Sequence, residues 1–172
     1  MFFLELITSS LNDSLNELVG KCFHMNRLLD RSVSLLNVKF HLINTAEILH
    51  YKAAHVYLGE NFADYIAEYQ ALRGNETMYP ATVAGNDVFD NPLGILLQFH
   101  SGNLEFENMI EDVIDDAEDI GDFTTKHFLE KLLDNLANMT ALSATLVDMF
   151  KDCGNDKFKM LMLDSVIKGY IQ

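Results

Sequence analysis

Proline is nearly absent from this sequence, and no other feature limits the possible folds as strongly. Its two prolines, Pro80 and Pro92, lie in or beside a short segment, residues 75–91, that is rich in asparagine, aspartate and glycine. Elsewhere apolar residues recur at steps of three and four, which predicts long amphipathic helices. The first such stripe consists of Leu11, Leu15, Leu18, Cys22, Met25, Leu29 and Leu36. The sequence therefore predicts an all-α fold.

Capping and turn signals divide the chain into five predicted helices. Ser10 is the expected N-cap of the first, and Asn44 with Glu47 three residues later resembles a capping box at the start of the second. The fifth helix is short and carries a stripe of Phe158, Met162, Val166 and Tyr170. The predicted helices cover residues of about 11–40, 45–73, 92–120, 123–150 and 156–170.

The connections between these helices predict a topology. The first and second helices, and likewise the third and fourth, are joined by short turns and should form antiparallel hairpins. The connection between the second and third is long enough to cross the length of a bundle. We therefore expect a single domain over residues 1–172, a four-helix bundle with one long crossover and a short fifth helix, which is the ferritin-like arrangement.

Charge and composition narrow the possible partners. The formal net charge is −14, so the surface should repel nucleic acid and favour cations. No uninterrupted apolar run is long enough to span a bilayer, and the N-terminus lacks the basic segment of a signal peptide. Cys22 and Cys153 are far apart in leucine-rich surroundings, which predicts buried, inert thiols in a reducing compartment. We expect a cytoplasmic protein with no membrane partner.

Polar residues along the second predicted helix form the strongest candidate site. Glu47 and His50 are spaced i, i+3, so both can reach one ion, and Asp64 and Glu68 continue the same helical line. His50 and Asp64 are 14 residues apart, roughly 21 Å along a helix, so one chain cannot bring both to one metal. A second chain, antiparallel across a two-fold axis, could bring its Asp64 and Glu68 to the His50 of the first chain. Histidine with carboxylate suits iron and similar divalent metals; the alternative is a polar face exposed to solvent or to a partner.

The segment Asp64-Tyr65-Ile66-Ala67-Glu68, followed by Leu72 and Gly74, resembles the signature of Dps proteins, the mini-ferritins. The resemblance implies an intersubunit iron site with Asp64 and Glu68 from one chain and two histidines from the other. Leu49-His50 resembles the second of these histidines, and His41 is the candidate for the first. It also implies ferroxidase chemistry with oxygen or peroxide, and storage of iron in a shell of subunits. DNA binding in that family goes with a basic tail, and none is expected here.

A complete di-iron site inside one bundle is not expected. Such a site would need carboxylates on all four helices, yet residues 135–147 of the fourth contain no acid and no histidine. The third helix has Asn103 on its apolar stripe, and only Glu17 and His24 of the first could contribute. These gaps leave a second hypothesis open: a ferritin-like bundle without metal chemistry that serves as a structural or protein-interaction oligomer.

The third predicted helix carries a dense acidic run. Residues 105–122 hold nine acids and no lysine or arginine, and like charges at helical spacing destabilise a helix unless something offsets them. A cation-loading surface inside a shell is one interpretation. An ordinary solvated face of an acidic protein is the other, and we favour it.

Overall fold

The computed structural model describes residues 6–53, 61–81 and 89–171. Six helices and no strand occur in these ranges. The helices are α1 (Ser9–Val38), α2 (Ile43–Ala53), α3 (Asn61–Leu72), α4 (Pro92–Asp119), α5 (Phe123–Cys153) and α6 (Lys157–Tyr170). The predicted second helix, 45–73, thus corresponds to α2 and α3, and its middle, 54–60, lies outside the described residues.

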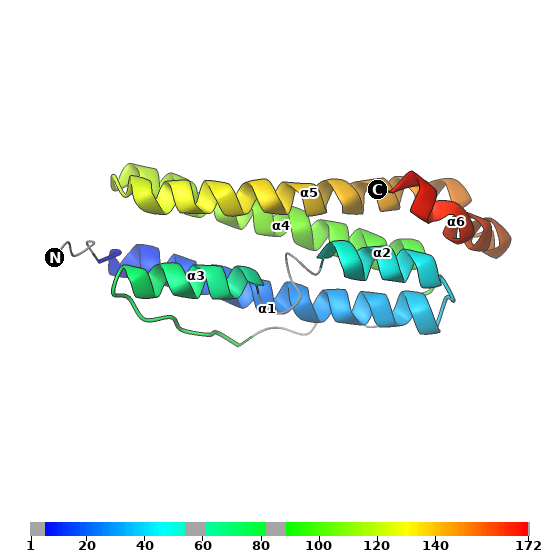
Figure 1. Ribbon diagram of the computed structural model, residues 1–172, viewed down its shortest axis with the longest axis horizontal. Coiled ribbons are helices and arrows are strands. Elements are labelled where there is room, and N and C mark those ends of the chain that lie inside the picture. The colour runs from blue at the N-terminus through cyan, green and yellow to red at the C-terminus, as the bar shows by residue number, and fades with distance from the viewer. Residues whose placement is uncertain (1–5, 54–60, 82–88, 172) are drawn as a thin grey trace.

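The helices form the predicted bundle (Figure 1). α1 packs against α2 and α3, which run back along it one after the other, and α4 and α5 form the second antiparallel hairpin. α4 also packs against α1, and the short α6 contacts α2 and α5. α3 ends near one end of the bundle and α4 begins near the other (Figure 1), so the connection between them is the expected long crossover. The all-α, four-helix prediction with a fifth, C-terminal helix is confirmed.

The start of α1 differs slightly from the prediction. Thr8, not Ser10, is the N-cap, and its Oγ1 accepts a hydrogen bond from the Leu11 backbone N–H at 3.3 Å. Residues 8–10 are three consecutive hydroxyl residues, any of which can cap a helix. Ile7 is buried in the core, only 3% exposed, which fixes the backbone directly before Thr8.

Large apolar side chains fill one continuous core between the helices. Phe62 of α3 contacts Phe106 of α4 with ring centroids 6.1 Å apart, and both are fully buried. Gly102 of α4 packs closely against α1, because a Cβ there would lie 2.8 Å from Met25 Sδ. Cys22 and Cys153 are buried as predicted, and burial raises the pKa of both thiols.

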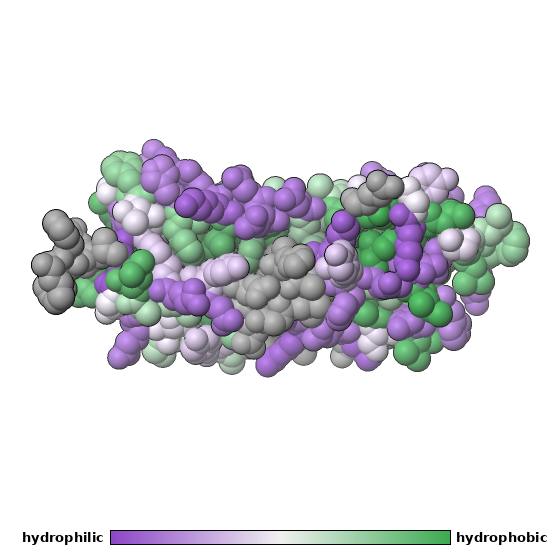
Figure 2. Space-filling model, viewed as in Figure 1, coloured by the Kyte–Doolittle hydropathy of each residue, from purple (hydrophilic) through white to green (hydrophobic). Residues whose placement is uncertain are grey.

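The apolar stripe of α6 faces away from the bundle. The side chains of Phe158, Met162, Val166 and Tyr170 are all exposed. A different face of the same helix, formed by Met160, Asp164 and Ile167, is buried against the bundle. Figure 2 shows apolar residues reaching the surface at the end of the molecule that carries α6. Periodicity identifies a face but not its partner, so the sequence alone could not tell which side packs. None of the described helices combines the length and the apolar character that crossing a bilayer requires.

Candidate metal site

The candidate ligands lie on the outer surface of the bundle. Glu47 and His50 of α2 and Asp64 and Glu68 of α3 are all exposed. The Glu47 carboxylate accepts a bond from Lys168 Nζ at 2.8 Å, which partly neutralises it. Among the described residues, no ion-pair partner is found for His50, Asp64 or Glu68.

The helix that carries Glu47 and His50 is fixed at its start by a carboxylate from α6. Asp164, 6% exposed, accepts bonds from the Thr45 N–H and the Thr45 hydroxyl, both at 2.7 Å, and from the Asn44 N–H at 3.3 Å. The predicted capping box is wrong here, because α2 begins at Ile43 and Asn44 lies inside it. A side chain 120 residues away satisfies the first-turn N–H groups instead.

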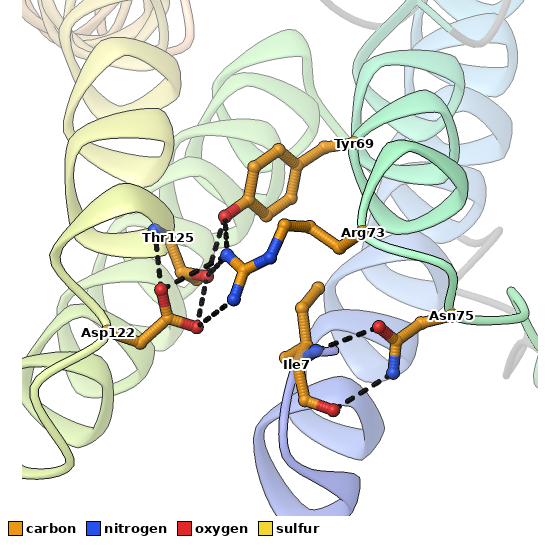
Figure 3. Close-up of polar contacts among 6 residues, drawn as sticks. All are labelled: Ile7, Tyr69, Arg73, Asn75, Asp122 and Thr125. Atoms are coloured by element: carbon orange, nitrogen blue, oxygen red, sulfur yellow. Dashed lines mark hydrogen bonds and ion pairs between the residues drawn. The ribbon is translucent and has the colours of Figure 1, made fainter. Parts of the chain in front are cut away.

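The helix that carries Asp64 and Glu68 is fixed at its end by a buried ion pair (Figure 3). Arg73, just beyond α3, donates from Nη1 and Nη2 to the two carboxylate oxygens of Asp122, at 3.1 and 3.2 Å. The same guanidinium donates to Tyr69 Oη at 2.6 Å, and the Thr125 hydroxyl donates to Asp122 at 2.8 Å. Since Asp122 is the N-cap of α5, the cluster ties α3 to the turn between α4 and α5.

This cluster changes the pKa of its acid. Burial by itself raises the pKa of Asp122, but hydrogen bonds from Arg73 and Thr125 outweigh that effect and hold the pKa below its usual value. Burial lowers the pKa of Arg73, and the Asp122 hydrogen bond more than compensates, so the pKa of the guanidinium is raised. Both groups are therefore charged, and they stabilise the position of α3.

The first candidate histidine, His41, lies in the turn between α1 and α2. It is exposed and has a left-handed backbone with φ of 57°. Its side chain lines a surface hollow that also includes Lys39 and Lys157. His41 and His50 are separated by most of α2, roughly 12 Å along the chain axis, so they are not adjacent ligands in this chain.

No set of three or more histidine, cysteine, aspartate or glutamate side chains is close enough to hold a metal ion within the described ranges of one chain. α2 and α3 place His50 and the Asp64–Glu68 pair at different levels of the bundle, as the helical spacing predicts. Ala54 and Tyr57, which continue the same helical spacing between His50 and Asp64, lie outside the described residues. The described ligands can therefore meet at one ion only if a second chain supplies part of the set.

Between α4 and α5, the inner side of the bundle carries neutral polar side chains and a histidine. Asn103 of α4 is fully buried and donates to Ser143 Oγ of α5 at 3.1 Å, and His100 Nδ1 lies 2.7 Å from the same hydroxyl. Glu17 of α1 is exposed and lines a small hollow of about 160 Å³ with Asp112 and Asp116 of α4. These contacts place an amide, a hydroxyl and an imidazole where α4 and α5 meet.

The acidic run of α4 is partly paired. Glu105 lies 3.2 Å from buried Lys21, Glu118 lies 3.1 Å from Lys126, and Asp122 binds Arg73. These contacts offset the repulsion that the sequence suggests. Asp122, the last acid of this run, has a structural role rather than a place on an open acidic surface.

Three structurally important residues do not stand out in the sequence: Asp164, Arg73 and Asn75. Asp164 looked like an ordinary acid in a short helix, and nothing in its neighbours indicated a partner on α2. Arg73 offered a weak signal, since it follows Tyr69 at i+4 and directly precedes a helix-ending glycine. The Asn75 side chain, which pairs with both backbone groups of Ile7 at 2.9 and 3.0 Å (Figure 3), offered none.

Comparisons with known proteins agree with this architecture. The ferritin-like domain family matches residues 42–151. An open-pore ferritin from the hyperthermophilic archaeon Archaeoglobus fulgidus superposes with a TM-score of 0.82 at 18% identity, covering 92% of this chain and 96% of that one. A humanized archaeal ferritin gives 0.81 at 17% identity, with 92% and 95% covered.

An engineered closed form of the A. fulgidus ferritin is equally similar, with a TM-score of 0.81, 18% identity, and 92% and 94% of the two chains covered. No curated protein matches the sequence significantly. At such low identity the solved structures establish the fold alone. The family match extends over more than half of the sequence and carries the assignment further: the chain belongs to the ferritin-like domain family.

Proposed function

We propose that this protein binds Fe(II) at sites completed by two subunits, and that it oxidises and stores the iron. His50 of one chain and Asp64 with Glu68 of the other would supply the ligands. One observation carries the proposal: all three side chains are exposed on the outer surface of α2 and α3, and no described metal-binding set is complete in one chain. Family membership supports iron as the substrate.

The chemistry of these side chains suits the task. An imidazole and two carboxylates form a mixed nitrogen and oxygen ligand set, which Fe(II) accepts. The carboxylates also offset the positive charge that grows when Fe(II) is oxidised to Fe(III). The electron acceptor is oxygen or hydrogen peroxide, as the Dps resemblance implies. Glu47 and His41 contribute less in this proposal, because each has basic side chains beside it, Lys168 for Glu47 and two lysines for His41.

Exposed aromatic residues support a two-chain contact on the same surface. Tyr51 is 66% exposed and adjoins His50, and Tyr65 is 49% exposed and adjoins Asp64. Tyrosine is enriched at protein–protein interfaces, where its ring is buried and its hydroxyl bonds the partner. The outward stripe of α6 provides a second apolar surface for self-association.

The first experiment measures the size of the protein assembly and its iron content in the same sample. The protein is loaded anaerobically with Fe(II), separated from free iron by size exclusion with light scattering, and its iron measured by elemental analysis. A dimer or larger assembly should hold about one Fe(II) per chain, because a two-fold pair has two equivalent sites.

A double substitution tests the ligand assignment. Asp64→Ala with Glu68→Ala should lower bound Fe(II) tenfold or more, since ligand loss exceeds the effect of removing supporting groups. The matched control is Asp148→Ala with Asp152→Ala, two exposed acids with the same i, i+4 spacing on α5, which should bind iron normally. Circular dichroism of each variant verifies that the bundle is intact. Normal iron uptake by the first variant would contradict the ligand assignment.

A second function deserves the same experiment. The polar contacts among His100, Asn103 and Ser143 fill the place where α4 and α5 meet, and α6 exposes an apolar stripe. These observations favour an oligomer that acts as a structural or protein-binding unit without metal chemistry. An assembled protein that retains no iron after loading would support this second function over the first.

A further inference from the structure

A hollow of about 780 Å³ lies at the end of the bundle where the α1–α2 turn, the start of α4 and the start of α6 meet. Its size falls within the range of small-molecule sites in proteins, about 300–1,000 Å³. None of the three residues proposed as iron ligands, His50, Asp64 or Glu68, lines it, whereas His41, which that ligand set does not include, does. The hollow is therefore a feature separate from the proposed iron site.

One part of its wall is apolar. Leu42 and Met160 are buried core residues, and Phe40 is half-buried against the same core. Leu161 of α6 adds a side chain that is 48% exposed and borders the opening. A ligand that covered Phe40 and Leu161 would remove their apolar surface from water, which favours binding.

The charged residues around it are mostly basic. Lys39, His41 and Lys157 line the hollow, against a single acid, Asp90. Lys39 is held in place, since its ammonium donates to the Phe89 carbonyl and lies 5.3 Å from the centre of the Phe40 ring. Lys157 is exposed and is not in an ion pair with any described residue. On a molecule of net charge −14, this excess of positive charge is local and unusual.

We propose that this hollow binds a small amphiphilic anion, a carboxylate on an acyl or aryl body. The apolar body would lie against the accessible side chains of Phe40 and Leu161, above the buried Leu42 and Met160, and the carboxylate would lie by Lys157 and His41. The two lysines disfavour a metal cation at the same place. An inorganic anion alone would leave the apolar wall exposed to water, so both parts of the ligand contribute.

The test uses decanoate, below the concentration at which it aggregates, as the probe. Decanol has the same chain without the charge, and inorganic phosphate has charge without the chain. Isothermal titration should show decanoate binding at least tenfold more tightly than either. Equal binding of decanol would overturn the anionic part of the proposal, and equal binding of phosphate would overturn the apolar part.

Two matched controls locate the bound probe. Lys157→Gln should weaken decanoate three- to tenfold and leave decanol unaffected, whereas Lys131→Gln, the same change at an exposed position on α5, should affect neither. In methyl-labelled protein, the Met160 signal should shift on binding and that of Met162, on the outward stripe of α6, should not. Equal weakening by both lysine variants, or a larger shift at Met162, would overturn the site. The iron measurement of the previous section is independent of these results.

Discussion

At the scale of single residues, two acids, Asp164 buried and Asp122 partly buried, connect parts of the chain that are remote in sequence, and both can be tested by substitution. Asp122 joins Arg73 across the bundle, and Asp164 joins the start of α2 to α6. Each fixes one of the two helices that carry the proposed iron ligands. Precise ligand placement requires such supporting contacts, because a ligand on a mobile helix loses affinity.

Substitution of Asp122 should lower stability in a pH-dependent way. Asp122→Asn leaves the Arg73 guanidinium buried without its counter-charge, so the free energy of unfolding should fall by about 2 kcal/mol near pH 7. The pKa of Asp122 is lower in the folded protein than in the unfolded chain. Its contribution is therefore complete above the unfolded-state value of about 3.9 and is lost as pH falls through the folded-state pKa.

Urea unfolding of the wild type and the variant, from neutral pH down to about pH 3, checks this expectation. The difference between the two proteins should narrow only in the acid range. Asp119→Asn, at an exposed acid nearby on α4, serves as the control and should cost little at any pH. A difference that stayed constant down to the lowest pH would show that the charge on Asp122 is not what stabilises the fold.

Removal of the Asp164 carboxylate should destabilise the protein more than removal of an exposed acid. Asp164→Ala leaves the N–H groups of Asn44 and Thr45 and the Thr45 hydroxyl without their acceptor, at a cost of about 1–3 kcal/mol. Asp164→Asn retains an acceptor oxygen and should lose less. Urea unfolding measures both, with Asp148→Ala as the exposed control; equal stability of Asp164→Ala and this control would refute the capping role.

At the scale of helices, the sequence predicts what depends on local spacing. The ends of α4 and α5 were predicted to within a few residues, because Pro92, Gly121 and Gly154 act through their own backbone. The capping of α2 was not predicted, because its first N–H groups are satisfied by a residue from the other end of the chain.

The difference between local spacing and distant contacts also explains which predicted apolar stripes are buried. Leu15, Leu18 and Met25 are buried as their stripe predicts, because the long α1 is enclosed by other helices. The stripe of α6 is exposed, because this short helix packs through Asp164 and its neighbours instead. For the candidate site, the sequence placed Glu47, His50, Asp64 and Glu68 on one polar helical line, but a site formed between chains depends on contacts that one chain does not contain.

The two exposed surfaces should have separable roles in assembly. Tyr51→Ser with Tyr65→Ser removes aromatic area beside the proposed ligands, and we expect it to weaken both the two-chain contact and iron binding by tenfold or more, as interface aromatics commonly do. Phe158→Ser with Met162→Ser changes only the stripe of α6 and should leave iron binding by the two-fold pair intact. Light scattering and iron content of each variant measure the two effects, and loss of iron in the α6 variant alone would contradict this assignment.

At the scale of the whole molecule, a site shared by two chains makes a prediction that a site within one chain does not. His50→Ala and the double variant Asp64→Ala with Glu68→Ala should each fail to bind iron when assembled alone. In a mixed two-fold pair, one site combines intact His50 from the second variant with intact Asp64 and Glu68 from the first. The other site in that pair lacks all three ligands.

Random mixing of the two variants makes roughly half of the pairs mixed, each with one of its two sites restored, so about a quarter of wild-type iron binding should return. The experiment dissociates and reassembles the two proteins together, with each reassembled separately as the control. Differently tagged chains allow the mixed pairs to be isolated before their iron is measured. Mixed pairs that form but hold no iron would refute a site shared in this way, because symmetry guarantees that one complete set of His50, Asp64 and Glu68 is present in each of them.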